Sequence, residues 1–465
     1  MKQLLSGTTC NIMTIVFYST NSNVYKGKDF DVQSFPLNAE RWQFFAKAYP
    51  EHRFIIVTQM PGMFLLDVKE NDVLHKASGI EYEICEEKDA LSFAQKIIAL
   101  KPDIAVAATF WVTPYDWLGI QDGMVADCLT AAGIRTYCHS AKTSLICFDK
   151  FRTHQELVRI GMNVPKAVYV HHELYWCERS HRELKTNVYK DYVLGQIKNM
   201  HYPVVIKDTV GLSSYGMEVA VSYKQAVHYL NLGRTNSDRL VEEYIDGIPF
   251  GTEIYGAHGF YEVMPPFMFS VNRYGITSPK QSVKIGPVLS DEYNVLSLKD
   301  MLTQLAIDMD FCGVAQVDLI FKDGTWYVIE INPRLSGMTE TYAASMGISV
   351  ADILMSTVTN KYLPQKNMKC VCNMKLPLLT DEQMETLHSE KDVLYLHQLH
   401  NLAAKQEREK GYCEAVIGGT QSMQELSACL DAFASRHPDM VEPAFVTVAK
   451  EMCTLAKEMC TLAKE

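Results

Sequence analysis

The chain has 465 residues, of which 48% are hydrophobic and 21% charged, with a formal net charge of -11. At roughly 100–200 residues per domain, this length indicates about three domains. The acidic balance disfavours nucleic acid as a general partner, because such proteins carry a basic surplus. No stretch approaches the ~20 apolar residues of a membrane helix, and residues 12–18 are too short an apolar run for a secretory signal. The 13 cysteines form no CxxC pair, which favours a reduced, cytoplasmic setting.

The first 140 residues alternate short apolar runs with helical segments. Strands are expected at 12–18, 54–57 and 104–107, and helices at 90–100 and 122–132, the second ended by Gly133. Strands that alternate with helices are typical of a parallel α/β layer. We therefore predict an N-terminal parallel α/β domain over residues 1–140.

A second unit is predicted over residues 141–365. Its expected elements are a helix at 151–160, strands at 203–207, 239–245, 313–321 and 326–331, and a loop at 208–216. The last two strands meet at Asp323-Gly324, a strong hairpin signal. Residues 171–200 are polar and aromatic and show no clear pattern.

Two smaller units are predicted after it. Residues 366–448 contain two expected helices and a strand at 414–417, which indicates a small C-terminal α+β domain. The sequence KEMCTLA then occurs at 450–456 and again at 457–463. Met452, Leu455, Met459 and Leu462 fall on one helical stripe, and two heptads are too few for a coiled coil. We expect residues 449–465 to form a solvated helical tail.

The hairpin GVAQVDLIFKDGTWYVIEINPR (313–334) is the strongest chemical signal in the chain. If its loop has an odd residue count, with Gly324 in a left-handed bulge, Asp318 lies opposite Glu330, and Asn332 shares their face. Like charges opposite each other destabilise a sheet, and a divalent cation between them removes the conflict. Carboxylate and amide oxygens suit Mg²⁺. The alternative is a solvated acidic pair, with Asn332 merely opening a turn.

Four further segments carry candidate binding residues. Arg334 follows the acidic face, where a guanidinium suits bidentate contact with phosphate or carboxylate. Lys207 ends an apolar strand before a Gly/Ser-rich loop, whose amides could form an anion nest. LVEEYIDG (240–247) runs a strand into a turn with paired carboxylates, and Lys150 begins a helix. Each segment alone also fits a solvated surface feature.

Taken in order, these segments resemble the ATP-grasp superfamily. The segments are FDKFRTHQELVRIGMNVPKA, PVVIKDTVGLSSYGMEVAV, LVEEYIDG, VDLIF and VIEINPRLSGMTETYAASMG, with GIQDGMVADCLTAAGIRTY upstream, and they span about residues 115–365. The resemblance to D-alanine–D-alanine ligase, L-amino-acid ligase and carbamoyl-phosphate synthase relatives implies an α/β, ATP-grasp fold. It would place an N-terminal parallel α/β domain before two ATP-grasp subdomains, with a hinge near 241–247.

The resemblance also implies roles for individual residues. Lys150 and Lys207 match the lysines that hold ATP phosphates, and Asp318, Glu330 and Asn332 match the magnesium ligands. Arg334 matches an arginine near the transferred phosphate, with the Gly337 backbone beside it. The lid and hinge matches are Ser213, Ser214, Gly216, Glu242, Glu243, Tyr244 and Ile245. Pro249 stands where many relatives have a ribose-binding Glu, and Glu253 is the next acid.

The implied activity is an ATP-dependent carboxylate–amine ligase that forms an amide or peptide bond through an acyl phosphate, by family analogy on amino acids or short peptides. Its cofactors would be ATP and Mg²⁺, with Mn²⁺ as an alternative ion. Its partners would be small carboxylates and amines, without nucleic acid or membrane, and a homodimer is compatible with the resemblance. The alternatives are a bicarbonate-activating, biotin carboxylase-like enzyme, a small-molecule kinase and a non-catalytic ATP-binding regulator.

Overall fold

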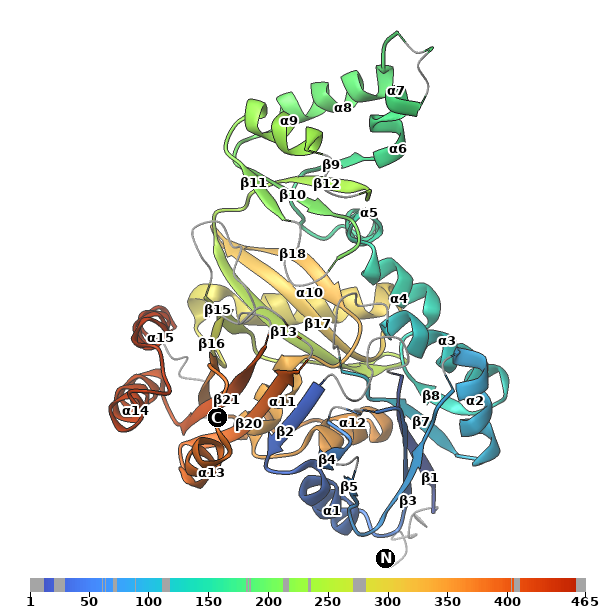
Figure 1. Cartoon of the computed structure of the whole chain (residues 1–465), viewed down its shortest axis with the longest axis vertical. Coiled ribbons are helices and arrows are strands. Elements are labelled where there is room, and N and C mark those ends of the chain that lie inside the picture. The colour runs from blue at the N-terminus through green and yellow to red at the C-terminus, as the bar shows by residue number, and fades with distance from the viewer. Residues whose placement is uncertain are drawn as a thin grey trace, which may run out of the picture.

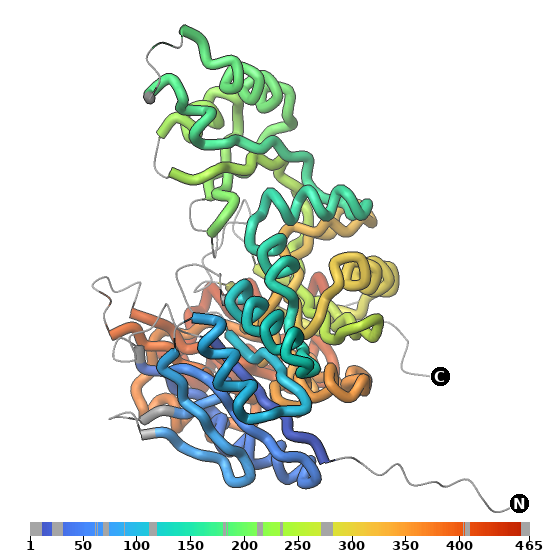
Figure 2. Tube along the Cα trace, turned by 90° about the vertical axis from the view of Figure 1, so that its right-hand side faces the viewer, coloured from blue at the N-terminus to red at the C-terminus, as the bar shows by residue number. Residues whose placement is uncertain are grey.

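The computed structural model describes residues 12–20, 30–60, 62, 64–69, 73–87, 89–110, 118–180, 183, 185–211, 217–232, 236–270, 282–402, 404 and 410–456. Three bodies follow one another along the longest axis: a small sheet with its helices at one end, a long sheet in the middle and a parallel sheet at the other end (Figures 1 and 2). Within the described residues, every helix is too short or too polar to span a bilayer.

The N-terminal domain is a five-stranded parallel sheet in the order β6-β3-β1-β7-β8. Its strands are β1 (Thr14–Ser19), β3 (Arg53–Thr58), β6 (Ile80–Ile84), β7 (Ile104–Ala107) and β8 (Arg135–Tyr137). The accompanying elements are α1 (Asn38–Ala48), α2 (Ala90–Ala99), α3 (Leu118–Ala131) and the ribbon β4 (Asp67–Lys69)–β5 (Val73–His75). The central strands are buried on both faces, as parallel strands between helices must be. The predicted parallel α/β layer is confirmed.

The second body is a four-stranded antiparallel sheet in the order β11-β10-β12-β9. Its strands are β9 (Ala167–Val170), β10 (Val204–Asp208), β11 (Glu218–Ala220) and β12 (Arg239–Glu243). The described part of residues 171–200 contains α6 (His172–Tyr175), α7 (Cys177–Ser180) and α8 (Val188–Lys198), and α9 (Tyr223–Asn231) lies beside α8. Before this body lie α4 (Ala141–Phe148) and α5 (Lys150–Arg159).

The third body is a sheet in the order β18-β17-β13-β15-β16-β19-β21-β20-β2, with β14 paired to β13. Its strands are β2 (Phe30–Phe35), β13 (Ile248–Ala257), β14 (Phe260–Val263), β15 (Phe267–Phe269), β16 (Val283–Gly286), β17 (Cys312–Lys322), β18 (Thr325–Asn332), β19 (Cys370–Leu376), β20 (Val393–Asn401) and β21 (Gly411–Thr420). The predicted small C-terminal α+β domain, residues 366–448, contributes β19, β20 and β21, and these strands continue the sheet that holds the β17–β18 hairpin. β2, from the N-terminal part of the chain, completes this sheet beside β20 (Figure 1).

Two groups of helices cover the two faces of the long sheet. One apolar core joins its first face to α10 (Val295–Asp308), α13 (Asp381–Ser389), α14 (Met423–Arg436) and α15 (Pro443–Leu455). A second core joins the opposite face to α11 (Gly337–Met346), α12 (Val350–Thr359) and the N-terminal domain. Short 3-10 helices lie at Asp291–Tyr293 and Gln365–Asn367. The second face is therefore where the N- and C-terminal parts of the chain meet.

The C-terminal helix differs from the solvated tail that we predicted over residues 449–465. α15 begins at Pro443 and buries Ala449, Met452, Cys453 and Ala456 against the first core. Leu455, which we placed on the apolar stripe, is 54% exposed. The helix packs through a face displaced from the heptad stripe, and the second KEMCTLA copy lies outside the described residues.

Candidate active site

The β17–β18 hairpin places Asp318 directly opposite Glu330, as predicted, and Gln316 opposite Asn332. The turn is a two-residue loop in which Asp323 and Gly324 both have positive φ, 48° and 78°, the geometry that Asp-Gly favours. The extra residue that is needed to bring Glu330 opposite Asp318 is supplied by a bulge between Asp318 and Leu319, and not by the turn. Bulges re-aim side chains at functional sites.

Burial and like charge set the electrostatics of this acidic pair. Burial and the neighbouring Glu330 raise the pKa of Asp318 to about 7. Burial also raises the pKa of Glu330, but Lys150 and Lys207 outweigh it, and the pKa of Glu330 lies below its ordinary value. Gln316 donates a hydrogen bond to Asp318 and accepts one of 3.0 Å from Asn332. A half-buried carboxylate pair of this kind gains most from a cation.

Among the described residues, no group of three or more histidine, cysteine or acidic side chains could hold a metal ion. The candidate magnesium ligands are instead two carboxylates and the amide oxygen of Asn332. This donor set fits a hard cation whose remaining ligands are phosphate oxygens and water, the usual coordination of Mg²⁺ at nucleotides. Their assignment as metal ligands stays a prediction.

The two predicted phosphate lysines reach this pair from different elements. Asp149 caps α5 by accepting from the Phe151 amide, which fixes Lys150 in the first turn. Lys150 Nζ lies 3.0 Å from Glu330 Oε1 and donates to the Gly211 carbonyl at 2.7 Å. Lys207 on β10 is 4% exposed and pairs with Glu242 Oε2 at 2.6 Å. Positive charge from two subdomains therefore converges beside the acidic face.

The predicted hinge follows β12, where Glu243 and Tyr244 are engaged in backbone contacts. The Glu243 amide donates to the Lys166 carbonyl at 2.9 Å, and the Tyr244 amide donates to the Pro203 carbonyl at 3.0 Å. Glu243 Oε1 accepts from the His201 amide at 2.9 Å. These bonds hold the strand end in place, and Ile245 is the next amide along the hinge.

Glu253 lies away from this hinge, inside the second core. Its Oε1 accepts hydrogen bonds from Ser336 and Thr339 at 2.7 and 2.8 Å, and Tyr255 donates to its Oε2. Burial raises the pKa of Glu253 to about 7. This arrangement does not favour Glu253, the next acid after Pro249, as a ribose contact, because both of its carboxylate oxygens accept hydrogen bonds from the chain itself. Its contacts anchor the start of α11 instead.

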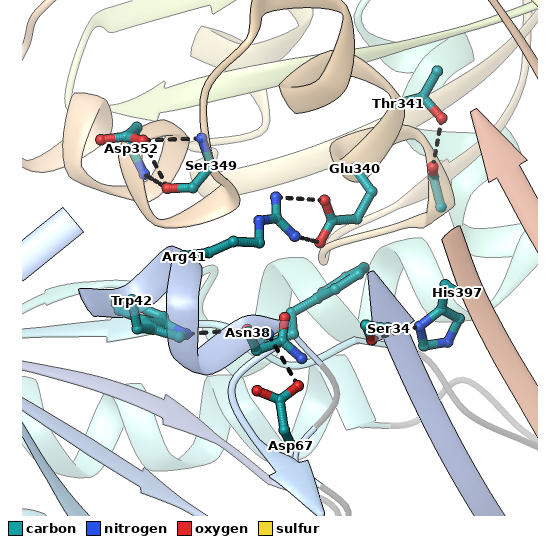
Figure 3. Close-up of polar contacts among 12 residues, drawn as sticks. Ser34, Asn38, Arg41, Trp42, Asp67, Glu340, Thr341, Ser349, Asp352 and His397 are labelled. Carbon is teal, nitrogen blue, oxygen red and sulfur yellow. Dashed lines mark hydrogen bonds and ion pairs between the residues drawn. The ribbon is translucent and has the colours of Figure 1, made fainter. Parts of the chain in front are cut away.

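The segment from Arg334 to Gly337 links the acidic hairpin to α11. Arg334 donates to Asn332 Oδ1 at 3.3 Å and to the Leu335 carbonyl at 3.1 Å. Ser336 and Thr339 form a capping box at the start of α11. Further along this helix, Glu340 forms a bidentate ion pair with Arg41 of α1, at 2.6 and 2.7 Å (Figure 3). The N-terminal domain thus braces the helix that follows Arg334.

The predicted lid residues Ser213, Ser214 and Gly216 lie outside the described residues. The loop begins directly after Lys207 and Asp208 on β10, and the chain resumes before β11. Lys150 contacts Gly211, the last residue described before the gap. The loop therefore starts beside the two lysines.

Comparison with known proteins matches this geometry to one family. Residues 147–338 match the model of the ATP-grasp domain, a range that includes both lysines, the acidic hairpin and Arg334. This segment of the chain is therefore an ATP-grasp domain.

Relatives found by sequence and by structure agree with this domain match. The carbamoyl phosphate synthase large chain of Methanothrix thermoacetophila is 26% identical over 229 residues, which make up 48% of this ATP-grasp chain and 20% of the relative. Thus the matched region spans only a fifth of that much longer protein.

Solved structures share the fold over almost the whole chain. The L-amino acid ligase from Bacillus licheniformis superposes with a TM-score of 0.61 at 16% identity, covering 92% of this chain and 98% of the ligase. The biotin carboxylase domain of Hydrogenobacter thermophilus 2-oxoglutarate carboxylase, solved with MgADP and bicarbonate, gives 0.57 at 12% identity and covers 95% and 94%.

Sequence reasoning missed several polar residues of this ATP-grasp protein near the acidic hairpin. Gln316 bridges Asp318 and Asn332. Lys284 on β16 acts on the charge of Asp318 from a strand that we did not predict. Lys375 on β19 and Glu414 on β21 lie farther along the same sheet, paired with each other. A charged residue inside an otherwise apolar run was the available signal, because buried charges are rare unless paired or functional.

Proposed function

We propose that this ATP-grasp protein is an ATP-dependent carboxylate–amine ligase that acts through an acyl phosphate. The observation that supports the proposal most directly is the convergence of Lys150 and Lys207 on the Asp318–Glu330 pair, with Arg334 next along the chain. Such a set offsets charge on a phosphoryl group in transfer, and it asks little covalent chemistry of the protein. An inert nucleotide-binding protein has no need for a half-buried, like-charged carboxylate pair.

The proposed reaction has two displacements. A substrate carboxylate oxygen forms a bond to the γ-phosphorus of ATP as the bond to the β-phosphate oxygen breaks, giving an acyl phosphate and ADP. A neutral amine then attacks the acyl carbon, loses a proton and expels orthophosphate, which leaves an amide. Mg²⁺, when bound at Asp318, Glu330 and Asn332, would neutralise charge on the phosphates.

The chain's own residues would position and shield these groups. Lys150 and Lys207 would hold the phosphates, and the loop at 208–217 would cover them and exclude water. The Ile245 amide is our choice for the contact with adenine, because the Glu243 and Tyr244 amides are already engaged. The guanidinium of Arg334 can bind acyl-phosphate oxygens in a bidentate way.

Amino acids or short peptides are the substrates that we propose, with L-amino acid ligase as the supporting neighbour. Bicarbonate is the second candidate, since the biotin carboxylase neighbour contains bicarbonate with MgADP. The two differ in their requirements: ligation needs an organic acid and an amine, whereas carboxylation needs bicarbonate.

Product analysis tests the proposal. ADP, orthophosphate and amide would be measured by chromatography and mass spectrometry, with ATP, Mg²⁺, amino-acid pairs or bicarbonate. We expect orthophosphate and an amide in equal amounts. Arg334→Lys should bind ATP normally and form little product, because lysine lacks the planar fork. The matched control is Arg152→Lys, which lies on α5 and is 54% exposed in its side chain. Accumulation of a stable phosphorylated acid without an amine requirement would refute ligase chemistry.

A further inference from the structure

A row of polar residues, of which Lys284 is half-buried and the others are buried, crosses the long sheet on the face that carries the acidic pair. Strand register places Lys284 opposite Asn373 and Lys375 opposite Glu414. On the next strands, His397 lies opposite Glu414, and Ser34 lies opposite His397. Cross-strand partners share a face. Phe269, which pairs with Lys284, has its ring over Gly251, the partner of Asp318. The row is thus continuous with the acidic hairpin.

Glu414 is the acidic member of this row, and one of its oxygens is already engaged. Lys375 Nζ and the Asn373 amide, the latter at 2.7 Å, both contact Oε1. Burial raises the pKa of Glu414, but Lys375 and Lys284 outweigh it and hold that pKa at about 2, so the carboxylate stays ionised. Its Oε2 accepts no hydrogen bond from the part of the chain that the structure describes.

Gly337 lies close to this carboxylate, with no side chain of its own in between. A Cβ at residue 337 would lie 3.2 Å from Glu414 Oε1 and 3.6 Å from Oε2. Any larger side chain there would therefore crowd the carboxylate. Since Gly337 is three residues after Arg334, the same turn borders the acidic hairpin and Glu414.

Lys284 is the complementary cation. Its ammonium lies 5.2 Å from the centre of the Phe269 ring and acts on the charges of Asp318 and Glu414. Among the described carboxylates, none lies within ion-pair distance of it. An ammonium with only an aromatic partner is available to an anionic ligand.

Two further buried atoms in the row have unused capacity. Asn373 Oδ1 and His397 Nε2 have no hydrogen-bond partner among the described residues, although Asn373 is 0% and His397 4% exposed. His397 Nδ1 contacts Ser34 at 3.2 Å, as Figure 3 shows. Buried polar atoms without partners are uncommon, and a bound polar ligand is one explanation.

We propose that this row binds a zwitterionic α-amino acid as the carboxylate donor of the ligase. Its ammonium contacts Glu414 Oε2 across Gly337, and its carboxylate points toward Lys284 and the acidic hairpin. This inference rests on the proposed function and adds the residues that bind the donor and the ionic form in which it binds. Lys284 and Lys375 outnumber Glu414, so the row has a net positive charge that attracts the substrate carboxylate. Glu414 Oε2 binds the substrate ammonium.

The arrangement has a consequence for the chemistry. An ammonium held by an ionised carboxylate keeps its proton, so it cannot act as the nucleophile. The donor carboxylate is then activated at the hairpin, and the attacking amine must belong to a second substrate. The site would therefore reject donors whose amine is acylated.

Ligand binding tests the site without turnover. Wild-type protein with Mg²⁺ and a non-hydrolysable ATP analogue is screened by thermal shift against the common amino acids. The best one is then compared by calorimetry with its N-acetyl and carboxamide derivatives. We expect the free amino acid to bind roughly 10- to 150-fold more tightly than either, which is the fold-change that corresponds to the about 1.5–3 kcal/mol of a charged hydrogen bond.

Two variants separate the two ends of the ligand. Glu414→Gln should abolish the preference over the N-acetyl derivative, because the ammonium loses its partner. Lys284→Met should weaken the free amino acid and its N-acetyl derivative alike and leave the carboxamide unchanged. Gly337→Ala should act like Glu414→Gln if the latter fails to fold. Glu425→Gln, an exposed glutamate in the first turn of α14, is the matched control.

Either of two results overturns the site: wild-type protein that binds no amino acid, or a folded Glu414→Gln protein that keeps its preference for the free ammonium. The proposed function fails separately. If an amino acid binds in a Glu414-dependent way but never drives phosphate release, the ligase activity is refuted and the binding site stands. If phosphate is released but Glu414→Gln keeps the wild-type selectivity, the binding site is refuted and the ligase activity stands.

Discussion

The buried Lys375–Glu414 pair predicts how the protein responds when one partner is removed. The Glu414 carboxyl has a pKa of about 2, against an ordinary 4.5, because Lys375 and Lys284 outweigh its burial. At about 1.36 kcal/mol per unit, its ionised form contributes roughly 3 kcal/mol near neutral pH. Burial and the neighbouring Lys284 lower the pKa of Lys375 from 10.5 to about 8, a cost of similar size. The pair is therefore close to neutral for stability.

Removing one partner of this pair and removing both should have different effects on stability. Lys375→Met leaves Glu414 buried without its main partner, and we expect a loss of about 3 kcal/mol. At an unfolding entropy of about 1 kcal/mol per kelvin for a chain of this length, the melting temperature falls by roughly 3 °C. Lys375→Met/Glu414→Gln should recover most of this loss, because the unmatched charge is gone. Lys450→Met, which breaks an exposed 2.6 Å pair with Asp431, should cost under about 0.5 kcal/mol.

Acid provides a second check on the same pair. A carboxyl whose folded pKa is depressed contributes stability that is complete above its unfolded pKa and is lost as the pH falls through the folded value. The gap between wild type and Lys375→Met should thus be full above about pH 4.5 and shrink to roughly 2 kcal/mol near pH 3.5. Melting curves by circular dichroism measure it. A single variant as stable as wild type, or a double variant no better than the single, would refute the reasoning.

Three further predictions concern the nucleotide site. Lys207→Ala should slow turnover on the order of 10²-fold or more at saturating ATP. Lys166→Ala, which changes an exposed lysine, should not slow it. If Lys207→Ala turns over as fast as wild type, Lys207 does not belong to the site. The loop at 208–217 should gain hydrogen-exchange protection when ATP binds, and strong protection in both states would contradict a lid. Asp318→Asn removes the like charge beside Glu330, so the nucleotide-free protein should melt no lower than wild type, while Mg²⁺ and ATP should no longer stabilise it.

Local patterns in the sequence were sufficient to locate the hairpin and the parallel domain. The Asp323-Gly324 turn marks the hairpin, but strict alternation from a two-residue turn would pair Asp318 with Ile329, and the bulge beside Asp318 brings Glu330 opposite it instead. The strand at 104–107 was predicted with the bounds that the structure has. The bulge that sets the hairpin register has no marker in the sequence, so the right pairing was predicted for an incomplete reason.

The role of a residue far along the chain depended on tertiary structure. Glu253 follows the hinge in sequence, but strand β13 carries it beside Ser336 and Thr339 in the second core. The C-terminal strands have ordinary alternation, and only pairing with β16 makes them part of the active-site sheet.

Sequence alone therefore determined the elements and motifs whose signals are local, including the ordered segments of the ATP-grasp superfamily. Tertiary structure decided which distant side chains share the face of the acidic hairpin. Glu414 lies 77 residues after Gly337 in the printed sequence, and no periodicity relates them. Their contact exists because β2, β20, β21 and β19 extend one sheet, which brings the C-terminal charges to the turn after Arg334.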